Sequence, residues 1–231
     1  MKAKVLIPVV AIAALLIVAA IGLPNLFKAA VPFQSKDNTK LVFNQDETIV
    51  ATATRGEGVL LWSTAGTKPP VRLAESDLAI PLCFQPDGQT LLAEQNGGLA
   101  YWLPNGARVG LGQNTKPARV RSNLREAAYS QDGSLIALHH SDKEKTLEIV
   151  SHYDTTMLLE VKGAEWFCWC QQDIVAVGFE SHLELWSVNG EKKLKTLDIG
   201  GGKEPAKIQG LCYNKERKAL ICVTQRGDVY H

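Results

Sequence analysis

The residues of this sequence that could do metal or redox chemistry are its cysteines and histidines. Zinc needs three or four thiolate, imidazole or carboxylate ligands together. Cys168 and Cys170 share one face of an expected strand, but no further Cys or His stands at ligand spacing from them. His139 and His140 are neighbours, so on a strand their side chains point to opposite faces, and we expect them at a strand end or at the surface. The sequence predicts no metal site and no cofactor.

Three aspartates could pass for a set of catalytic carboxylates. Asp46, Asp87 and Asp132 each follow an aromatic residue by three positions, and Gly88 and Gly133 come directly after two of them. Asp can bond its own backbone in a turn, and Gly accepts the positive φ that such a turn requires. We therefore interpret all three as turn residues. No catalytic sequence motif appears elsewhere, so no enzyme activity is predicted.

A basic segment is the remaining candidate for binding. Lys116, Arg119, Arg121 and Arg125 lie in one connection between apolar runs. Such a segment is either a solvated loop or a contact for an acidic partner or lipid headgroups. The whole chain has 25 Lys and Arg against 24 Asp and Glu, a net charge of +1, which does not favour nucleic acid as a partner. We expect these four residues to form a partner-binding loop.

The elements that must position these residues repeat along the chain. Aromatic residues that end a short apolar run recur every 40 to 45 positions, at Phe43, Phe84, Tyr129, Trp169 and Tyr213. Three further apolar runs follow the first four of these marks, and two follow the last. The runs are short, rich in Val, Ile, Leu and aromatics, and separated by Gly, Asp, Asn, Ser and Pro, which predicts strands joined by turns. Four strands per repeat of this length is the unit of a β-propeller blade.

The motifs FQPDG and YSQDG, and strands that end in Leu-Trp or Tyr-Trp, resemble the repeats of WD-repeat and TolB-like propellers. The resemblance covers about residues 38–231 and implies an all-β propeller of about five four-stranded blades. Propellers of this kind commonly act as scaffolds in multiprotein assemblies. The usual Asp after the Trp is absent, since Ser63, Leu103 and Ser187 stand there, so the usual buried hydrogen-bond network of the family is not expected.

The fifth repeat lacks a fourth apolar run, which would leave an unpaired edge. Residues 28–37 form a linker, within which Ala29 to Gln34 could supply the missing strand and close the ring. Pro32 is compatible with an outermost strand, which has one free edge. Two alternatives stay open: the chain is a fragment of a longer propeller, or two chains share a ring.

The N-terminal part, residues 1–27, has a different character. Val5 to Pro24 is uninterrupted by charged or hydrogen-bonding side chains and is long enough to cross a bilayer as one helix. Lys2 and Lys4 precede it, and the apolar run exceeds that of an ordinary cleaved signal peptide. The sequence predicts an uncleaved single-span membrane anchor, and cleavage after a small residue is the alternative.

These features together predict a membrane-anchored propeller that acts as a scaffold for unidentified protein partners. The short lysine-bearing tail favours an inside N-terminus, which places the propeller in the periplasm or outside the cell, with the cytoplasmic face as the other possibility. The alternative function is a small envelope enzyme, a hydrolase or lyase, with its site at the mouth of the central channel. The oligomeric state is not predicted.

Overall fold

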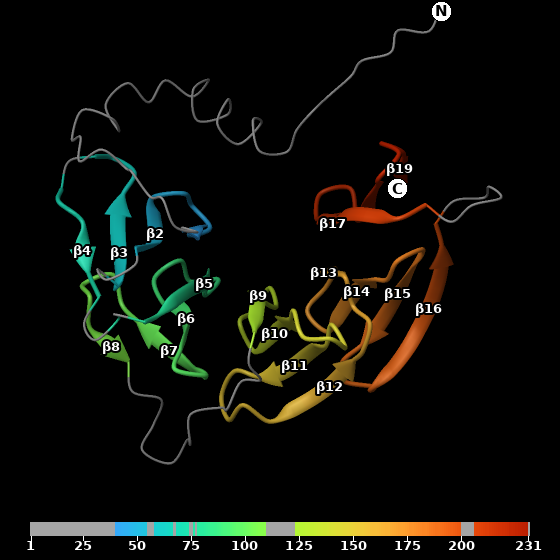
Figure 1. Ribbon diagram of the computed structural model, residues 1–231, viewed down its shortest axis with the longest axis horizontal. Helices are drawn as coiled ribbons and strands as arrows, with labels where there is room; N and C mark the ends of the chain where they lie inside the picture. The colour runs from blue at the N-terminus through green and yellow to red at the C-terminus, as the bar shows by residue number, and fades with distance from the viewer. Residues whose placement is uncertain are drawn as a thin grey trace, which may run out of the picture.

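The computed structural model describes residues 40–54, 58–66, 68–73, 76, 78–109, 123–199 and 206–230. Within these ranges the chain forms nineteen strands in five antiparallel sheets, and no helix. Four sheets have four strands and the fifth has three. Within every sheet the strands are hydrogen-bonded in sequence order, and the first strand is the innermost (Figure 1). Figure 1 shows the sheets following one another around an open arc, with the first strand of each at the inner edge. The predicted five-bladed all-β architecture is confirmed in this part of the chain.

The strands of the first three blades match the predicted apolar runs. Blade 1 contains β1 (Leu41–Phe43), β2 (Ile49–Thr54), β3 (Gly58–Ser63) and β4 (Val71–Arg72). Blade 2 contains β5 (Ile80–Phe84), β6 (Leu91–Gln95), β7 (Gly98–Trp102) and β8 (Arg108–Val109). Blade 3 contains β9 (Leu124–Tyr129), β10 (Leu135–His140), β11 (Leu147–Ser151) and β12 (Met157–Val161).

The last two blades follow the same plan, except that the final one is a strand short. Blade 4 contains β13 (Trp166–Trp169), β14 (Ile174–Gly178), β15 (His182–Ser187) and β16 (Lys192–Asp198). Blade 5 contains β17 (Ile208–Asn214), β18 (Ala219–Thr224) and β19 (Val229–Tyr230). The innermost strands of consecutive blades contact each other, β1 with β5, β5 with β9, β9 with β13 and β13 with β17.

The predicted aspartate turns join the first and second strands. Asp87 Oδ1 accepts hydrogen bonds from the backbone N–H of Gln89 at 2.8 Å and of Thr90 at 3.2 Å. Asp132 Oδ1 accepts in the same way from Ser134, at 3.2 Å. Gly88 follows Asp87 with a φ of +70°. These carboxylates are therefore turn residues, as the sequence predicts.

Each blade packs on its neighbours through two different faces. The register aligns Phe84, Leu91 and Trp102 across blade 2, and these side chains pack against Ala51 and Leu61 of blade 1. We call this the trailing face, the one that contacts the preceding blade.

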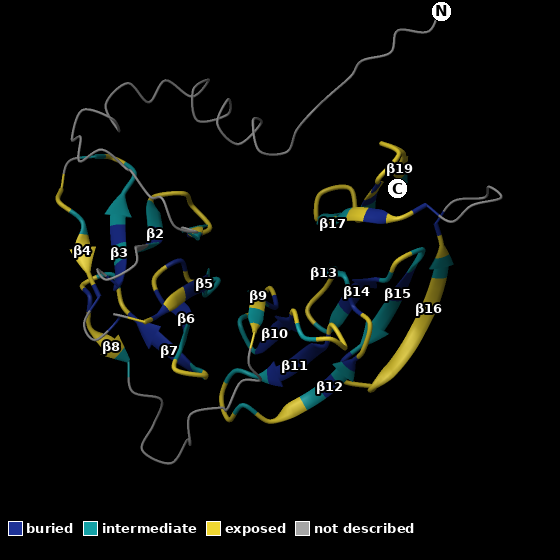
Figure 2. Cartoon of the chain, viewed as in Figure 1, coloured by how far each residue is buried: buried dark blue, intermediate teal, exposed yellow. Residues whose placement is uncertain are grey.

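Figure 2 shows that burial is greatest in the middle strands and least in the outer strands β4 and β16.

The opposite side of each blade, the leading face, contacts the following blade. In blade 2 it carries Leu92 and Tyr101, which pack against Ala127 and Ile136 of blade 3. This alternation follows from the two-residue period of a strand, which sends successive side chains to opposite faces. Every blade interface in the arc therefore joins one leading face to one trailing face.

The tryptophans of the third strands are hydrogen-bonded even though the expected Asp is absent. Trp62 Nε1 donates to Thr52 Oγ1 at 3.0 Å, and Trp186 Nε1 donates to Glu184 Oε2 at 3.0 Å. The sequence led us not to expect the family's usual network, and these two bonds show that the indole groups find other partners within their own blades.

The predicted N-terminal features lie outside the described residues. These are the anchor at residues 1–27, with its span from Val5 to Pro24, and the linker at residues 28–37. In the described part of the chain, no helix is long and apolar enough to cross a membrane. No described strand pairs with the outer edge of β19, so ring closure by Ala29 to Gln34 remains a prediction.

Candidate interaction site at the mouth of the propeller

Five residues from four blades lie at or near the starts of the innermost strands. Lys40 directly precedes β1, Ile80 begins β5, Arg125 and Glu126 lie near the start of β9, and Trp166 begins β13. We call these five residues the mouth surface. The repeat brings them together because equivalent ends of consecutive innermost strands lie side by side around the arc.

Arg125 is an exposed cation held against an aromatic ring. Its guanidinium carbon lies 5.4 Å from the centre of the Trp166 ring, which is the geometry of a cation–π contact between blades 3 and 4. The Trp166 Nε1–H in turn donates to the Ile208 carbonyl in blade 5, at 3.1 Å. The Trp166 ring therefore contacts Arg125 through its face and Ile208 through its N–H. This holds the guanidinium in a defined orientation, in which its N–H groups can donate to a ligand.

Lys40 connects blade 1 to blade 3 across the inner edge of blade 2. Its Nζ donates to the Arg125 carbonyl at 3.1 Å. Burial lowers the pKa of Lys40, while the nearby charge of Glu126 opposes that shift. The lysine thus ties the start of β9 to the start of β1 and supports the backbone from which Arg125 projects.

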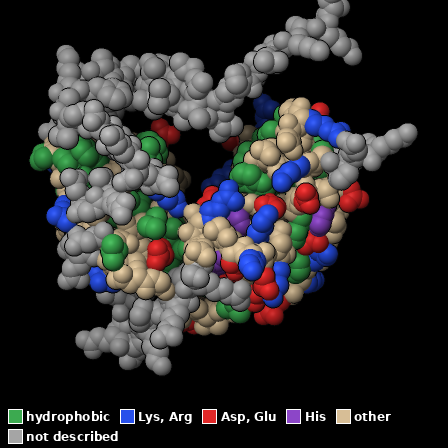
Figure 3. All heavy atoms as spheres, viewed as in Figure 1, with side chains coloured by type: hydrophobic (Ala, Val, Ile, Leu, Met, Phe, Trp, Pro, Cys, Tyr) green, Lys and Arg blue, Asp and Glu red, His purple; other side chains and the backbone are tan. Residues whose placement is uncertain are grey.

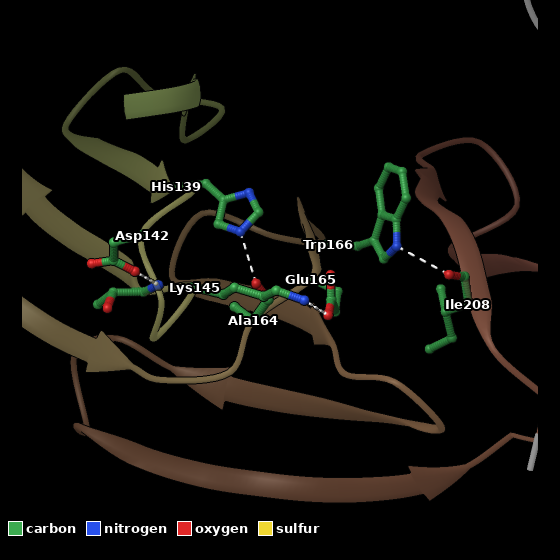
Figure 4. Close-up of polar contacts among 8 residues, drawn as sticks. His139, Asp142, Lys145, Ala164, Glu165, Trp166 and Ile208 are labelled. Atoms are coloured by element: carbon green, nitrogen blue, oxygen red, sulfur yellow. Dashed lines mark hydrogen bonds and ion pairs between the residues drawn. The ribbon is translucent and has the colours of Figure 1, made fainter. Parts of the chain in front are cut away.

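Two loops hold blades 3 and 4 together, and Figure 4 shows Lys145, Ala164 and Glu165 of these loops. The Ala164 N–H donates to the Lys145 carbonyl at 2.9 Å, and the Lys145 ammonium pairs with the Glu165 carboxylate. The His139 Nε2–H donates to the Ala164 carbonyl at 2.8 Å. Burial lowers the pKa of His139, and the positive charge of Arg125 contributes in the same direction. His139 is therefore a buried imidazole whose Nε2–H is bonded to the backbone and whose pKa lies below its ordinary value.

Apolar side chains flank the charged part of the mouth surface. Ile80 is 43% exposed, and Leu78, just before the same strand, is 71% exposed. In Figure 3, acidic and basic side chains are interspersed over the later blades, in the same view as Figure 1. An Arg stacked on a Trp beside exposed aliphatic side chains is the composition of a protein-binding surface.

A second polar cluster lies between blades 2 and 3, away from the mouth. The Gln85 Nε2–H donates to Tyr129 Oη at 3.4 Å, and His152 Nδ1 lies 3.5 Å from the same oxygen. Burial raises the pKa of Tyr101 to about 12 and lowers that of His152. Near pH 7 the two tyrosines therefore keep their protons and the imidazole is neutral, so these side chains carry no charge.

The structure describes only one of the four basic residues that the sequence proposed for partner binding. Arg125 lies on β9, in the mouth surface, rather than in a loop. Lys116, Arg119 and Arg121 lie outside the described residues. Sequence reasoning missed Lys40, Ile80 and Trp166, although a common signal was available, since each stands three or four residues before the aromatic mark of its repeat.

The structure buries the two neighbouring histidines and places the cysteines in different surroundings. His139 and His140 end β10 as predicted, but they are 2% and 0% exposed and so do not lie at the surface. The His139 ring packs edge-on against Phe167 of blade 4. Cys222 fills a small buried position, whereas Cys212 is exposed at the end of the arc. Burial raises the pKa of the Cys83 thiol to about 12, which makes it inert. Among the described residues, no three His, Cys, Asp or Glu side chains are placed to hold a metal ion.

Comparison with known proteins gives a fold and no family. No protein-family model matches the chain, and no curated protein matches it in sequence. Among solved structures, it is similar to the C-terminal WD40 domain of Sif2, with a TM-score of 0.60 and 18% sequence identity. The match covers 84% of this chain, which spans 58% of the length of that domain. The fold is therefore WD40-like, as the repeats predict, and the TolB-like part of the resemblance gains no support.

Proposed function

We propose that this chain is a protein-interaction scaffold that acts by recognition rather than by turnover. The observation that carries the proposal is the Arg125–Trp166 stack at the mouth, flanked by Ile80 and Leu78. Its partner is a protein segment with a carboxylate that binds the edge of the Arg125 guanidinium and an apolar side chain that packs on Leu78 and Ile80. The WD40-like fold supports this assignment, because the rigid strands of such a fold hold the contacting side chains in place.

The envelope enzyme considered from the sequence receives no specific support from the described site. His139 is 2% exposed, so its buried Nδ1 is shielded from a substrate, and burial raises the pKa of Tyr101 and Tyr129 in the second cluster. The contacts of Arg125 and Lys40 instead hold a charged group in a fixed position on the mouth surface.

Membrane attachment is part of the same proposal. The apolar run from Val5 to Pro24 anchors the propeller and confines its mouth surface to the bilayer, which raises its effective concentration near other membrane components. With the N-terminus inside, the propeller lies in the periplasm or outside the cell.

The experiment is co-purification of the full chain, with its N-terminal segment, from membranes solubilised in mild detergent. Arg125→Glu is expected to lower recovery of the bound protein at least about tenfold, because it turns an attraction for a carboxylate into a repulsion. Ile80→Asp is expected to act in the same direction by placing a charge against the partner's apolar side chain.

The matched control is Arg217→Glu, which makes the same charge change on an exposed turn between β17 and β18. Its recovery should equal that of the unaltered chain. If Arg125→Glu folds normally and retains every partner, or if no stable partner is recovered in any mild detergent, the proposed function is wrong.

A further inference from the structure

The two ends of the arc expose blade faces that are buried everywhere else in it. No described blade precedes blade 1, so no described blade covers its trailing face. The register places Phe43, Val50 and Trp62 on that face, in the positions that Phe84, Leu91 and Trp102 occupy in blade 2. Phe43 is 51% exposed, whereas Phe84 is 8% exposed beneath blade 1.

The rest of the trailing face of blade 1 is also apolar across its first three strands. Leu41, Thr52 and Leu60 form the next register row, and Leu41 is 52% exposed. The only polar group among these three is the Thr52 hydroxyl, which accepts the hydrogen bond from Trp62. This face offers no charged side chain from β1, β2 or β3 to keep it in water.

Blade 5 presents the complementary kind of face at the other end. Leu211, Leu220 and Tyr230 pack toward blade 4. The alternate residues therefore form the open leading face: Cys212, Ile221, Val223 and Val229. Val223 is 38% exposed and Val229 is 60% exposed.

Arrays of stacked repeats normally end in repeats with a polar outer face, since an apolar end would otherwise remain in water. Neither end blade meets that condition on the described strands. One end is a leading face and the other a trailing face, and all four interfaces inside the arc join one face of each kind. The chain thus carries both halves of a blade interface, one at each end.

We propose that a second copy of this chain covers these faces, with blade 5 of one copy packed on blade 1 of the other. The contact repeats the interfaces within the arc, with Val223 and Val229 of one copy against Phe43 and Leu41 of the next. It is a head-to-tail contact between different surfaces, so it gives a ring if the rotation closes and a longer assembly if it does not. The proposal is independent of the partner at the mouth surface.

The experiment measures self-association of the full chain in detergent by sedimentation over a wide range of protein concentration. The unaltered chain is expected to shift from one copy to larger species as concentration rises. Phe43→Asp and Val223→Asp are each expected to weaken association at least about 100-fold, because each buries an unpaired carboxylate in an apolar contact. Thermal unfolding of each variant checks that its blades still fold.

A mixture of the two variants provides the decisive measurement. The Phe43→Asp chain keeps an intact blade 5 face, and the Val223→Asp chain keeps an intact blade 1 face, so one interface can form between them. The mixture is expected to regain association and to stop at two chains. The matched control is Met157→Asp, an exposed apolar position on the outermost strand of blade 3, which should associate like the unaltered chain.

Three results would overturn the proposal. A single copy at every concentration would mean that another occupant, such as residues 28–37 or a separate protein, covers the end faces. Dimers lost in Phe43→Asp but retained in Val223→Asp would mean that two trailing faces meet. Failure of the mixture to regain association, with both variants folded, would exclude the head-to-tail contact.

Discussion

Single residues at the hairpin turns decide how much backbone strain each blade carries. Glu47 has a φ of +58°, at the position where blades 2 and 3 place Gly88 and Gly133. A side chain with a Cβ is disfavoured in this left-handed region, by roughly 1–2 kcal/mol. The turn between the first two strands is therefore strained in blade 1, whereas glycine relieves the same turn in blades 2 and 3.

We predict that Glu47→Gly raises the stability of the protein by about 0.5–1 kcal/mol, since relief of strain exceeds the added entropy of the unfolded chain. Gly88→Ala is the reciprocal change and should lower stability by about 1 kcal/mol. A Cβ at Gly88 would lie 3.7 Å from Asn44 Nδ2, so the cost comes from the backbone and not from a clash. Thermal unfolding measures both, and a destabilised Glu47→Gly variant would contradict the strain argument.

His139 makes stability depend on pH. Its Nε2–H is bonded to the Ala164 carbonyl, and its buried Nδ1 has no hydrogen-bond partner among the described residues. Burial lowers the folded pKa of His139 below its ordinary value of 6.5. Between the two pKa values the unfolded chain binds more protons than the folded chain, so stability falls as the pH falls through that window.

We therefore predict that the free energy of unfolding declines as the pH is lowered below about 6.5, the ordinary pKa of the unfolded group. His139→Gln should flatten this decline, because the Gln amide can still donate to the Ala164 carbonyl and does not titrate. Denaturant unfolding at a series of pH values tests this. An unchanged slope in the variant would show that His139 is not responsible.

At the scale of elements, the blades are joined by specific polar contacts as well as by apolar faces. Asn44 is 3% exposed at the turn after β1. Its Nδ2–H₂ donates to the Gly88 carbonyl in blade 2 at 3.1 Å, and its Oδ1 accepts from the Ile49 N–H at 2.8 Å. One side chain thus completes the hairpin of blade 1 and binds it to the hairpin of blade 2.

Asn44→Ala should cost about 2 kcal/mol, because it leaves two buried backbone groups without partners. Asn214 occupies the same repeat position in blade 5, where its Oδ1 accepts only a local bond from the Arg217 N–H at 2.9 Å. Asn214→Ala is the matched control and should cost about 1 kcal/mol or less. Equal losses in the two variants would show that the contact to blade 2 contributes nothing.

At the scale of the whole molecule, the arc carries its polar recognition groups at the mouth and its apolar groups at its two ends. The mouth surface depends on four consecutive blades. The end faces depend on what lies beyond the first and last blades. A change at one of these surfaces should therefore leave the other intact, which keeps the tests of the two proposals separate.

Membrane attachment is also a whole-molecule property. The full chain is expected to stay in the membrane pellet after an alkaline wash, because a span of about 20 apolar residues inserts almost irreversibly. Deletion of residues 1–27 should release the propeller into the supernatant. Release of the full chain would rule out the anchor, and intact-mass measurement would distinguish cleavage of the N-terminal segment.

Much of the architecture could be predicted from local signals. The recurrence of Phe43, Phe84, Tyr129, Trp169 and Tyr213 placed all five innermost strands correctly, since turn chemistry and two-residue alternation are readable within a few positions. The turn role of Asp87 and Asp132 was predicted for the same reason. Of the candidate site, only Arg125 could be named in advance, and it was assigned to a loop rather than to a strand.

Contacts between blades could not be predicted, because they join residues about 20 or more positions apart in the sequence. Composition alone indicates neither that Lys40 reaches the Arg125 carbonyl nor that Trp166 lies beneath the guanidinium. The same holds for burial: Phe43 and Phe84 occupy one repeat position, yet only Phe84 has a blade against it. Local sequence specified the strands and turns, because their causes lie within a few residues, whereas the arc determined which faces are buried, exposed or brought together at the mouth.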